Sequence, residues 1–234
     1  MWCEMGDEQR QAYNRIRDLY KEKVFNRIQE QGIAASTIYV LEGLTRLRQI
    51  CNAPQLVESE SHIPHSVKLD ELMREISENT GAHKVLVFSQ FTGMLQLIAK
   101  AMEQEGLKFL YLDGSTKAEN RQQLVNQFQE EEEMRVFLIS LKAGGVGLTL
   151  TAADYEYLVD PWWNPAAEQQ AIDRTHRIGQ QNKVFAYKMI CKDSVEEKIL
   201  ALQQRKKMIA DDLISEDTGF VKKLTEDDVA FLFS

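Results

Sequence analysis

The stretch KVLVFSQFTGMLQLIAKAM, residues 84–102, contains the two periodicities that decide the fold. Its first part, 84–90, is a nearly continuous apolar run, which is typical of a strand buried on both faces of a parallel sheet. In the second part apolar residues recur at helical spacing, at Phe91, Met94, Leu95, Ile98 and Met102. The stretch therefore predicts a strand that turns directly into a helix covering the sheet.

The same alternation continues along the chain. Further strand-like apolar runs occupy residues 109–114, 135–140, 155–160 and 183–190. A capping box of Thr116 and Glu119 predicts the start of the helix after the second run. Asn164 as N-cap and Pro165 in the first turn predict another helix after the fourth run. The order βαβαβ, then βαβ after a short insertion, indicates an α/β fold with a doubly wound, mainly parallel sheet flanked by helices.

Both flanks of this region are predicted to be helical. Residues 1–57 lack strand signals, and their last helix should run from about residue 37 to Cys51 and stop before Pro54. The polar segment 58–65 has the composition of a linker.

A second capping box marks the C-terminal flank. Ser194 and Glu197 predict the start of a helix that extends to about Leu213 and braces the sheet domain. We therefore expect three segments: N-terminal linker helices, the α/β domain, and a C-terminal brace helix with a tail. Their expected bounds are 1–57, 58–193 and 194–234.

Composition limits the classes of function. The net charge of −8 has the wrong sign for a protein that coats nucleic acid indiscriminately, so any such contact must be a local patch. No signal peptide or membrane-length apolar run is visible, which predicts an intracellular protein without a membrane partner. The cysteines at positions 3, 51 and 191 are scattered and lack metal-binding spacing, so we expect thiols in a reducing compartment and predict neither a zinc site nor a disulfide framework.

Two loops follow predicted strands at the sheet edge where doubly wound folds bind ligands. In the first, Ser89 to Thr92, hydroxyls and the amides of a helix start can hold a phosphate, although a plain helix cap explains the same residues. In the second, SLKAGGVGLTLTAAD at 140–154, small residues allow close approach of a ligand and Lys142 adds a positive charge; the alternative is a tight turn that needs glycine. A dinucleotide-binding loop is excluded, because the third glycine and the distant acidic residue are missing.

A third feature is the segment QQAIDRTHRIGQ, residues 169–180. Gln170, Arg174 and Arg177 stand at offsets of four and seven, so on a helix they share one face. Arginines in this arrangement can hold the charge that builds on a transferring phosphoryl group, whereas an isolated pair more often forms surface ion pairs. Just before them, DPWWNP at 160–165 places two tryptophans at a strand end, where they are either buried or able to report nucleotide state.

The order of these motifs resembles the second RecA-like lobe of Swi/Snf-type DNA translocases in helicase superfamily two. The segments that carry the resemblance are SQFT at 89–92, LDGST at 112–116, LKAGGVGLTLTAAD at 141–154, DPWWNP at 160–165 and EQQAIDRTHRIGQ at 168–180. It covers roughly residues 40–234, and TRLRQICNAP at 45–54 resembles the segment that enters that lobe. The start, CEMGDEQRQAY at 3–13, is similar to the end of the family's first lobe.

The resemblance implies roles for individual residues. Arg174 and Arg177 match the arginine fingers, and Gln170 opens their motif; with Gly147 these residues would bind nucleotide. The residues expected to hold the DNA backbone are Ser89, Gln90, Phe91, Ser140, Lys142, Gly144 and Gly145. The residues expected to couple the two lobes are Asp160, Trp162 and Trp163.

Two positions depart from the family pattern. Leu141 stands where relatives often have threonine, and Ala53 replaces a common histidine. A hydroxyl contact to phosphate from the glycine loop would therefore fall to Ser140.

Half of an ATPase site is missing from the sequence. No G-x-x-x-x-G-K-[ST] motif occurs, so nothing cradles the β and γ phosphates. We also expect no D-E-x-x pair of this chain to supply a magnesium carboxylate and a water-orienting group. The resemblance thus implies the C-terminal lobe of a longer ATP-dependent double-stranded-DNA translocase, with ATP and Mg²⁺ bound in the full-length protein and no metal held by this chain. Its expected partners are the N-terminal RecA-like lobe of the same protein and DNA.

For the isolated chain, we expect a monomer that does not hydrolyse ATP. The expected location is the bacterial cytoplasm or nucleoid, or the eukaryotic nucleus. Two alternatives remain at this point: an RNA helicase lobe, whose relatives carry a different arginine motif, and a scaffold that kept the fold and lost catalysis. A phosphate-loop sequence upstream of Met1 would favour the translocase over the scaffold.

Overall fold

The computed structural model describes residues 1–57, 63, 65–141, 143, 150–161, 183–207 and 217–234. The chain divides into two compact units. Among the described residues, the first unit holds Met1, 68–161 and 183–189, and the second holds 2–67 and 190–234. In this part of the chain no helix is both long and apolar enough to cross a membrane.

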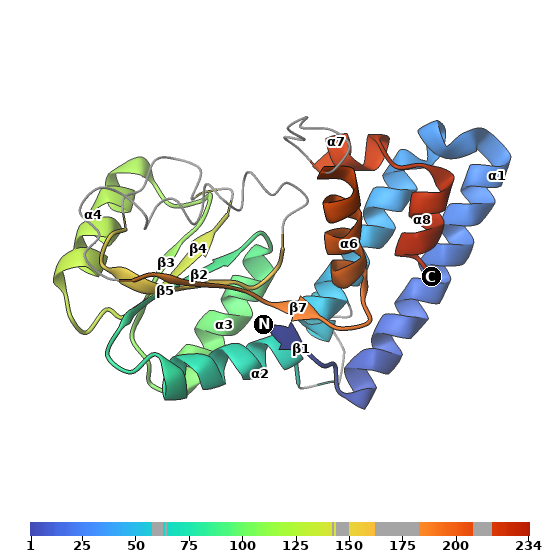
Figure 1. Ribbon diagram of the computed structural model, residues 1–234. Coiled ribbons are helices and arrows are strands. Elements are labelled where there is room, and N and C mark those ends of the chain that lie inside the picture. The colour runs from blue at the N-terminus through green and yellow to red at the C-terminus, as the bar shows by residue number, and fades with distance from the viewer. Residues whose placement is uncertain (58–62, 64, 142, 144–149, 162–182, 208–216) are drawn as a thin grey trace. The chain divides into compact units, whose positions relative to one another are not determined.

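The first unit is built on a parallel sheet of five strands in the order β3-β4-β2-β5-β6 (Figure 1). The strands are β2 (Lys84–Ser89), β3 (Phe109–Leu112), β4 (Val136–Ser140), β5 (Ala153–Leu158) and β6 (Phe185–Lys188). Every neighbouring pair is parallel, and Phe88 of β2 is aligned with Ile139 on one side and with Leu158 on the other. Each strand overlaps a predicted apolar run, and the α/β fold with a parallel sheet is confirmed.

The apolar character of the inner strands reflects burial on both faces. All five residues of β4 are buried, as are Val85 to Ser89 of β2. Helix α3 (Thr92–Gln104) follows β2 directly and buries the predicted residues Met94, Leu95, Ile98 and Met102. Among the described residues of this unit, the other helices are α2 (Val67–Arg74), the π-helix Glu75–Asn79 and α4 (Ala118–Glu130). Strand β2 is thus covered on both faces, as its sequence predicts, and the structure places it in the middle of the sheet.

The predicted capping box at Thr116 and Glu119 is wrong. Helix α4 begins one residue later than that box requires, after Lys117, and no side chain caps it. The hydroxyl of Thr116 instead accepts a hydrogen bond from the backbone N–H of Asp113 at 3.1 Å, while the Asp113 carboxylate accepts from the amide and the hydroxyl of Ser115. The turn before the helix uses the hydroxyl that the cap would need.

The second unit contains a long helical hairpin. Helix α1 (Asp7–Asn52) is interrupted at Gly32, whose φ of 78° lies in the left-handed region that favours glycine, so its two arms run side by side (Figure 1). The hydroxyl of Tyr20 on the first arm donates to Glu42 on the second at 2.9 Å, and Lys23 pairs with the same carboxylate. The helix ends at Asn52, before Pro54, as predicted, and a short 3₁₀ turn follows at Pro54–Leu56.

Three C-terminal helices pack in the same unit. They are α6 (Val195–Lys207), α7 (Asp217–Lys222) and α8 (Glu226–Leu232). The start of α6 falls at the predicted place, but its capping bonds are displaced by one residue: Ser194 accepts from the amide of Glu196, and Glu197 accepts from that of Asp193. The predicted end near residue 213 lies outside the described residues.

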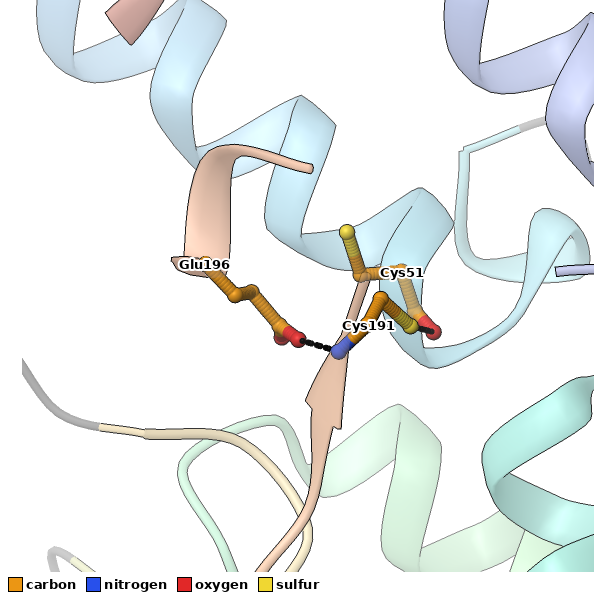
Figure 2. Close-up of side chains that lie close together, drawn as sticks. All are labelled: Cys51, Cys191 and Glu196. Atoms are coloured by element: carbon orange, nitrogen blue, oxygen red, sulfur yellow. Dashed lines mark hydrogen bonds between the residues drawn. The ribbon is translucent and has the colours of Figure 1, made fainter. Parts of the chain in front are cut away.

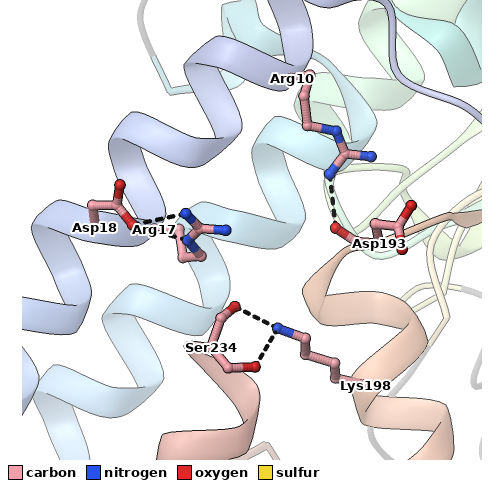
Figure 3. Close-up of polar contacts among 6 residues, drawn as sticks. All are labelled: Arg10, Arg17, Asp18, Asp193, Lys198 and Ser234. Carbon is pink, nitrogen blue, oxygen red and sulfur yellow. Dashed lines mark hydrogen bonds and ion pairs between the residues drawn. The ribbon is translucent and has the colours of Figure 1, made fainter.

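Polar contacts join this start of α6 to the first arm of α1 and to the end of the chain (Figure 3). The guanidinium of Arg10 donates to the carbonyl oxygen of Asp193 at 2.7 Å, and the ammonium of Lys198 donates to the hydroxyl of Ser234 at 2.8 Å. Burial, with smaller contributions from nearby Arg17 and Lys21, lowers the pKa of Lys198. Segments distant in sequence therefore close one helical core.

One prediction for the N-terminal flank is wrong. Residues 1–57 do contain a strand: β1 (Trp2–Cys3) pairs in parallel with β7 (Ile190–Cys191). A strand of two residues has no periodicity that a sequence pattern can reveal. The pairing brings Cys3 opposite Cys191, which are far apart in sequence.

Gly43 provides a test of packing in the helical unit. A methyl group at this position would lie 2.9 Å from the ring of Phe233, which is fully buried, and 3.0 Å from the ring of Tyr20. In an open helix, replacing glycine by alanine stabilises by about 1 kcal/mol. Here we expect Gly43→Ala to lower the free energy of unfolding by about 1–3 kcal/mol, because two packed rings must move.

Urea unfolding of the wild type and the variant measures this difference. Gly114→Ala is the matched control, because a methyl group there meets nothing within 4 Å. A Gly43→Ala variant as stable as the wild type would mean that α1 and α8 do not pack as closely as described.

Candidate functional site

The predicted loops meet at the carboxyl edge of the sheet. Ser89 ends β2 and Ser140 ends β4, and the two residues are aligned neighbours in the parallel pairing. The backbone N–H of Leu141 donates to the carbonyl oxygen of Ser89 at 2.9 Å, which continues the ladder by one bond beyond the strand. On the other side, the N–H of Val159 donates to Phe88 at 3.0 Å, so the chain after β5 reaches the same edge. This is where doubly wound folds gather ligands.

The buried carboxylate of Asp160 ties these strand ends together. It accepts hydrogen bonds from the hydroxyl of Ser89 and from the backbone N–H of Gln90, the latter at 3.0 Å. The Ser89 hydroxyl oxygen in turn accepts from the N–H of Phe91 at 3.0 Å. Both Ser89 and Asp160 have no exposed surface. The loop that begins α3 is therefore held from inside by an ionisable group.

A buried lysine lies beneath the same loop. The ammonium of Lys68, at the start of α2, donates to the carbonyl oxygen of Val159 at 2.6 Å, and the residue is fully buried. The Lys68 ammonium thus bonds to the residue that directly precedes Asp160 in the chain. Lys68 is not among the residues predicted from the sequence, because a single lysine at a helix start belongs to no recognisable pattern.

Arg121 is a second residue that the sequence analysis missed. From α4 its guanidinium donates to the carbonyl oxygen of Thr116 at 3.0 Å and to that of Ala143 at 3.4 Å. It therefore joins the turn after β3 to the start of the glycine loop. Ala143 is the one described residue between Leu141 and Leu150.

A cavity of about 540 Å³ opens beside this turn. The cavity is lined by Tyr111, Ser115, Thr116, Lys117, Asn120, Gln123, Leu124 and Gln127. The hydrogen bond from the Ser115 hydroxyl is the main cause that lowers the pKa of nearby Asp113, which keeps that carboxylate ionised.

The structure describes Ser89, Gln90, Phe91, Ser140 and Asp160 of the predicted site, and their roles in binding stay predictions. Ser89 and Asp160 are in direct contact, Ser140 is adjacent and 3% exposed, and Gln90 and Phe91 are half-buried at the start of α3. The Ser89 hydroxyl points to Asp160, whereas the prediction had it facing a phosphate. The two departures from the family pattern, Leu141 and Ala53, are both buried apolar residues.

The remaining predicted site residues lie outside the described residues, so their roles stay predictions. They are Lys142, Gly144, Gly145, Gly147, Trp162, Trp163, Gln170, Arg174 and Arg177, together with the predicted helix start at Asn164 and Pro165. In the described part of the first unit no group of three metal-ligating side chains lies close together.

Comparison with known proteins identifies the domain. Residues 67–179 match the family model of the helicase conserved C-terminal domain. DNA repair protein RAD5B of Arabidopsis thaliana is 44% identical over 156 residues, which is 65% of this chain and 12% of RAD5B. An uncharacterized ATP-dependent helicase of Mycoplasma pneumoniae is 31% identical over 100% of this chain, which spans 22% of that helicase. The chain thus corresponds to a small part of these relatives.

Two solved structures from Sulfolobus solfataricus share the fold. The C-terminal domain of a SWI2/SNF2 ATPase superposes with a TM-score of 0.80 at 26% identity, covering 99% of this chain and 95% of that domain. The core of a SWI2/SNF2 ATPase in complex with double-stranded DNA gives a TM-score of 0.81 at 27% identity, covering 99% of this chain and 48% of that core. The likeness therefore extends over both compact units of the chain.

The contact between Ser89 and Asp160 can be tested by its effect on stability. We expect Ser89→Ala to lower the free energy of unfolding by about 1–3 kcal/mol, because it leaves a buried carboxylate and the Phe91 amide each one partner short. Urea unfolding measures the change. Ser77→Ala is the control, since the Ser77 side chain is exposed and its loss should matter by less than about 0.5 kcal/mol. Equal stabilities of the two variants would contradict the described role of Ser89.

Proposed function

Because the chain belongs to the Swi2/Snf2-type helicases, of which it is the C-terminal helicase lobe, we propose that it forms one side of an ATP cleft in a longer double-stranded-DNA translocase. The observation that carries this proposal is the match of residues 67–179 to the helicase C-terminal domain, since that segment includes Gln170, Arg174 and Arg177. The likeness to a SWI2/SNF2 ATPase core in complex with double-stranded DNA supports DNA as the substrate.

On the nucleotide side, Arg174 and Arg177 act as fingers that stabilise the charge of the transferring phosphoryl group, and Gln170 and Gly147 help to hold the nucleotide. The partner for this step is the N-terminal RecA-like lobe of the same protein. That lobe supplies the phosphate loop, because this sequence contains none.

The carboxylate of Asp160 does not offer a magnesium site. The carboxylate of Asp160 is buried and already accepts hydrogen bonds from Ser89 and Gln90. A magnesium ion takes carboxylates together with waters and substrate phosphates in an octahedral arrangement, which a buried, hydrogen-bonded group does not offer.

On the DNA side, the start of α3 and the glycine loop hold the phosphate backbone. Ser89 acts by positioning, because its hydroxyl is taken by Asp160. The groups expected to meet a phosphate are the side chain of Gln90 and backbone amides at the start of α3, where a helix N-terminus favours an anion. Ser140, Lys142, Gly144 and Gly145 supply the second contact, where Lys142 brings the positive charge.

The coupling of these two sides falls to the segment that contains Asp160, Trp162 and Trp163. Asp160 contacts the start of α3 directly, and the segment leads on to the residues of the arginine motif. A shift of the arginine motif on ATP binding would therefore reach the loop that grips DNA through a short, continuous stretch of chain. This is how closure of the cleft would move the DNA contact.

The arginine fingers can be tested in the full-length protein. We expect Arg174→Ala or Arg177→Ala to lower kcat for DNA-stimulated ATP hydrolysis by roughly 10³-fold, the scale of arginine fingers, with little change in DNA affinity. Steady-state ATPase assays and DNA binding measured on the same preparations separate the two effects.

Arg74→Ala is the matched control for these variants. Arg74 is exposed and pairs with its neighbour Glu71 on α2, so its loss should leave kcat unchanged. A finger variant that loses DNA binding in proportion to ATPase activity would mean that the arginines hold DNA. A full-length protein without any ATPase activity would favour the scaffold.

The DNA contact can be tested by its dependence on salt. Each phosphate neutralised by a lysine contributes about −0.9 to the slope of log affinity against log salt concentration, whereas amide contacts contribute little. We expect Lys142→Ala to make the slope shallower by about that amount on two unrelated duplexes alike. Lys100→Ala, an exposed lysine on α3, is the control and should leave the slope unchanged. If Lys142→Ala matches the wild type on both duplexes, Lys142 is not a phosphate contact.

A further inference from the structure

The second unit contains a cluster of metal-ligating side chains that the proposed function does not use. Cys51 lies near the end of α1, Cys191 lies in β7, and Glu196 lies in the first turn of α6. One ligand atom of each, two sulfurs and a carboxylate oxygen, lie within 4.8 Å of one another (Figure 2). All three residues have no exposed surface. The fold therefore brings two thiols and a carboxylate together from three separate elements.

The backbone holds the three residues in place. The Cys191 sulfur donates to the carbonyl oxygen of Cys51 at 3.3 Å, across a sequence separation of 140 residues. The Glu196 carboxylate accepts from the backbone N–H of Cys191 at 3.0 Å, which fixes its place beside that residue (Figure 2). Ser194 fixes the loop between them, because its hydroxyl donates to the Cys191 carbonyl at 2.7 Å and accepts from the Glu196 amide.

A simpler account explains each residue separately. A buried cysteine behaves as a small apolar side chain, and a glutamate in the first turn of a helix is stabilised by the helix dipole. That account does not explain why an acidic side chain is buried in the same place as two thiols. Two thiols and a carboxylate are donor types that bind zinc, and here they come from three separate elements of the fold.

We propose that Cys51, Cys191 and Glu196 form a structural zinc site. Thiolate sulfur selects zinc over the hard cations magnesium and calcium, and zinc also takes carboxylate oxygen. Tetrahedral coordination with Zn–S of about 2.3 Å needs the sulfurs about 3.8 Å apart, so small side-chain rotations suffice. A water molecule or a main-chain oxygen takes the fourth position, because no fourth side chain of the described residues joins the cluster.

Binding changes the protonation of the site in a defined way. Zinc binds the thiolate form, so each cysteine releases its proton to solvent and about two protons leave per bound ion. The sulfur of Cys191 then exchanges its weak hydrogen bond to Cys51 for a bond to the metal. The ion would join α1, β7 and α6, so it would stabilise the helical unit and leave the chemistry of the sheet edge unchanged. This inference is independent of the proposed function.

Cobalt titration of the metal-free chain tests the site directly, because tetrahedral Co²⁺ with thiolate ligands has a characteristic visible and near-ultraviolet absorption. We expect about one Co²⁺ per chain, displacement by Zn²⁺, release of about two protons, and a thermal midpoint that rises with zinc concentration. The absence of the thiolate–cobalt spectrum in the wild type would overturn the proposal.

Variants identify the ligands. Cys51→Ser, Cys191→Ser and Glu196→Gln should each weaken Co²⁺ binding by about 10-fold or more, on the order of losses seen when metal-site residues are changed. Cys3→Ser is the matched control: Cys3 is as buried as the ligands and pairs with Cys191 in the sheet, but its sulfur is outside the cluster. Loss of binding in Cys3→Ser equal to that in Cys51→Ser would show unspecific thiol binding and would overturn the three-residue site.

A measurement on the wild type decides the matter if the serine variants do not fold. Zinc should slow the reaction of two of the three thiols with a thiol reagent, and a chelator should reverse the protection. The two neighbouring thiols could instead form a disulfide. A non-reduced chain with a single titratable thiol and no cobalt spectrum would show that state, and the zinc site would be wrong.

Discussion

The carboxylate of Asp160 is the interaction on which the candidate site depends. A buried charge must be paired or hydrogen-bonded, and Asp160 meets this need with the hydroxyl of Ser89 and the amide of Gln90. Those two residues join β2 to α3. The hydrogen bonds that Asp160 accepts from them therefore fix the shape of this loop at the carboxyl edge of the sheet. The segment that begins at Asp160 also leads towards the predicted arginine motif. A single carboxylate therefore connects the expected DNA contact with the expected nucleotide contact.

This arrangement explains why the strands could be predicted from the sequence. A strand that is covered on both faces must be apolar at nearly every position, and β2 and β4 are buried at every residue from 85 to 89 and from 136 to 140, with a serine only at the last position of each. Helix α3 must then cover the sheet with one face, which Met94, Leu95, Ile98 and Met102 provide. Burial of whole elements leaves a repeating pattern, and a repeating pattern can be recognised without a structure.

Features that depend on single contacts could not be predicted in the same way. Thr116 and Glu119 have the spacing of a capping box, but the Asp113 turn uses the threonine hydroxyl first. The strand at Trp2–Cys3 exists because its partner Ile190–Cys191 comes back to it from the other end of the chain. Lys68 and Arg121 donate hydrogen bonds to main-chain carbonyl oxygens. Every residue type has such an oxygen, so the sequence does not indicate these contacts. The hydroxyl of Ser89 is a related case, since residue type predicted a polar role there but not the direction of its bond.

The cysteine cluster also depends on contacts between distant parts of the chain, so sequence spacing did not predict it. Metal sites are recognised in sequences by short spacings, because two ligands on one turn or hairpin must be close in the chain. Cys51 and Cys191 violate that expectation, since the chain returns over 140 residues before their side chains meet. The return is enforced by the β1–β7 pairing and by the packing of α6 in the helical unit, neither of which the spacing of cysteines reflects. Scattered ligands therefore exclude a zinc finger, but they do not exclude a site that the tertiary fold assembles.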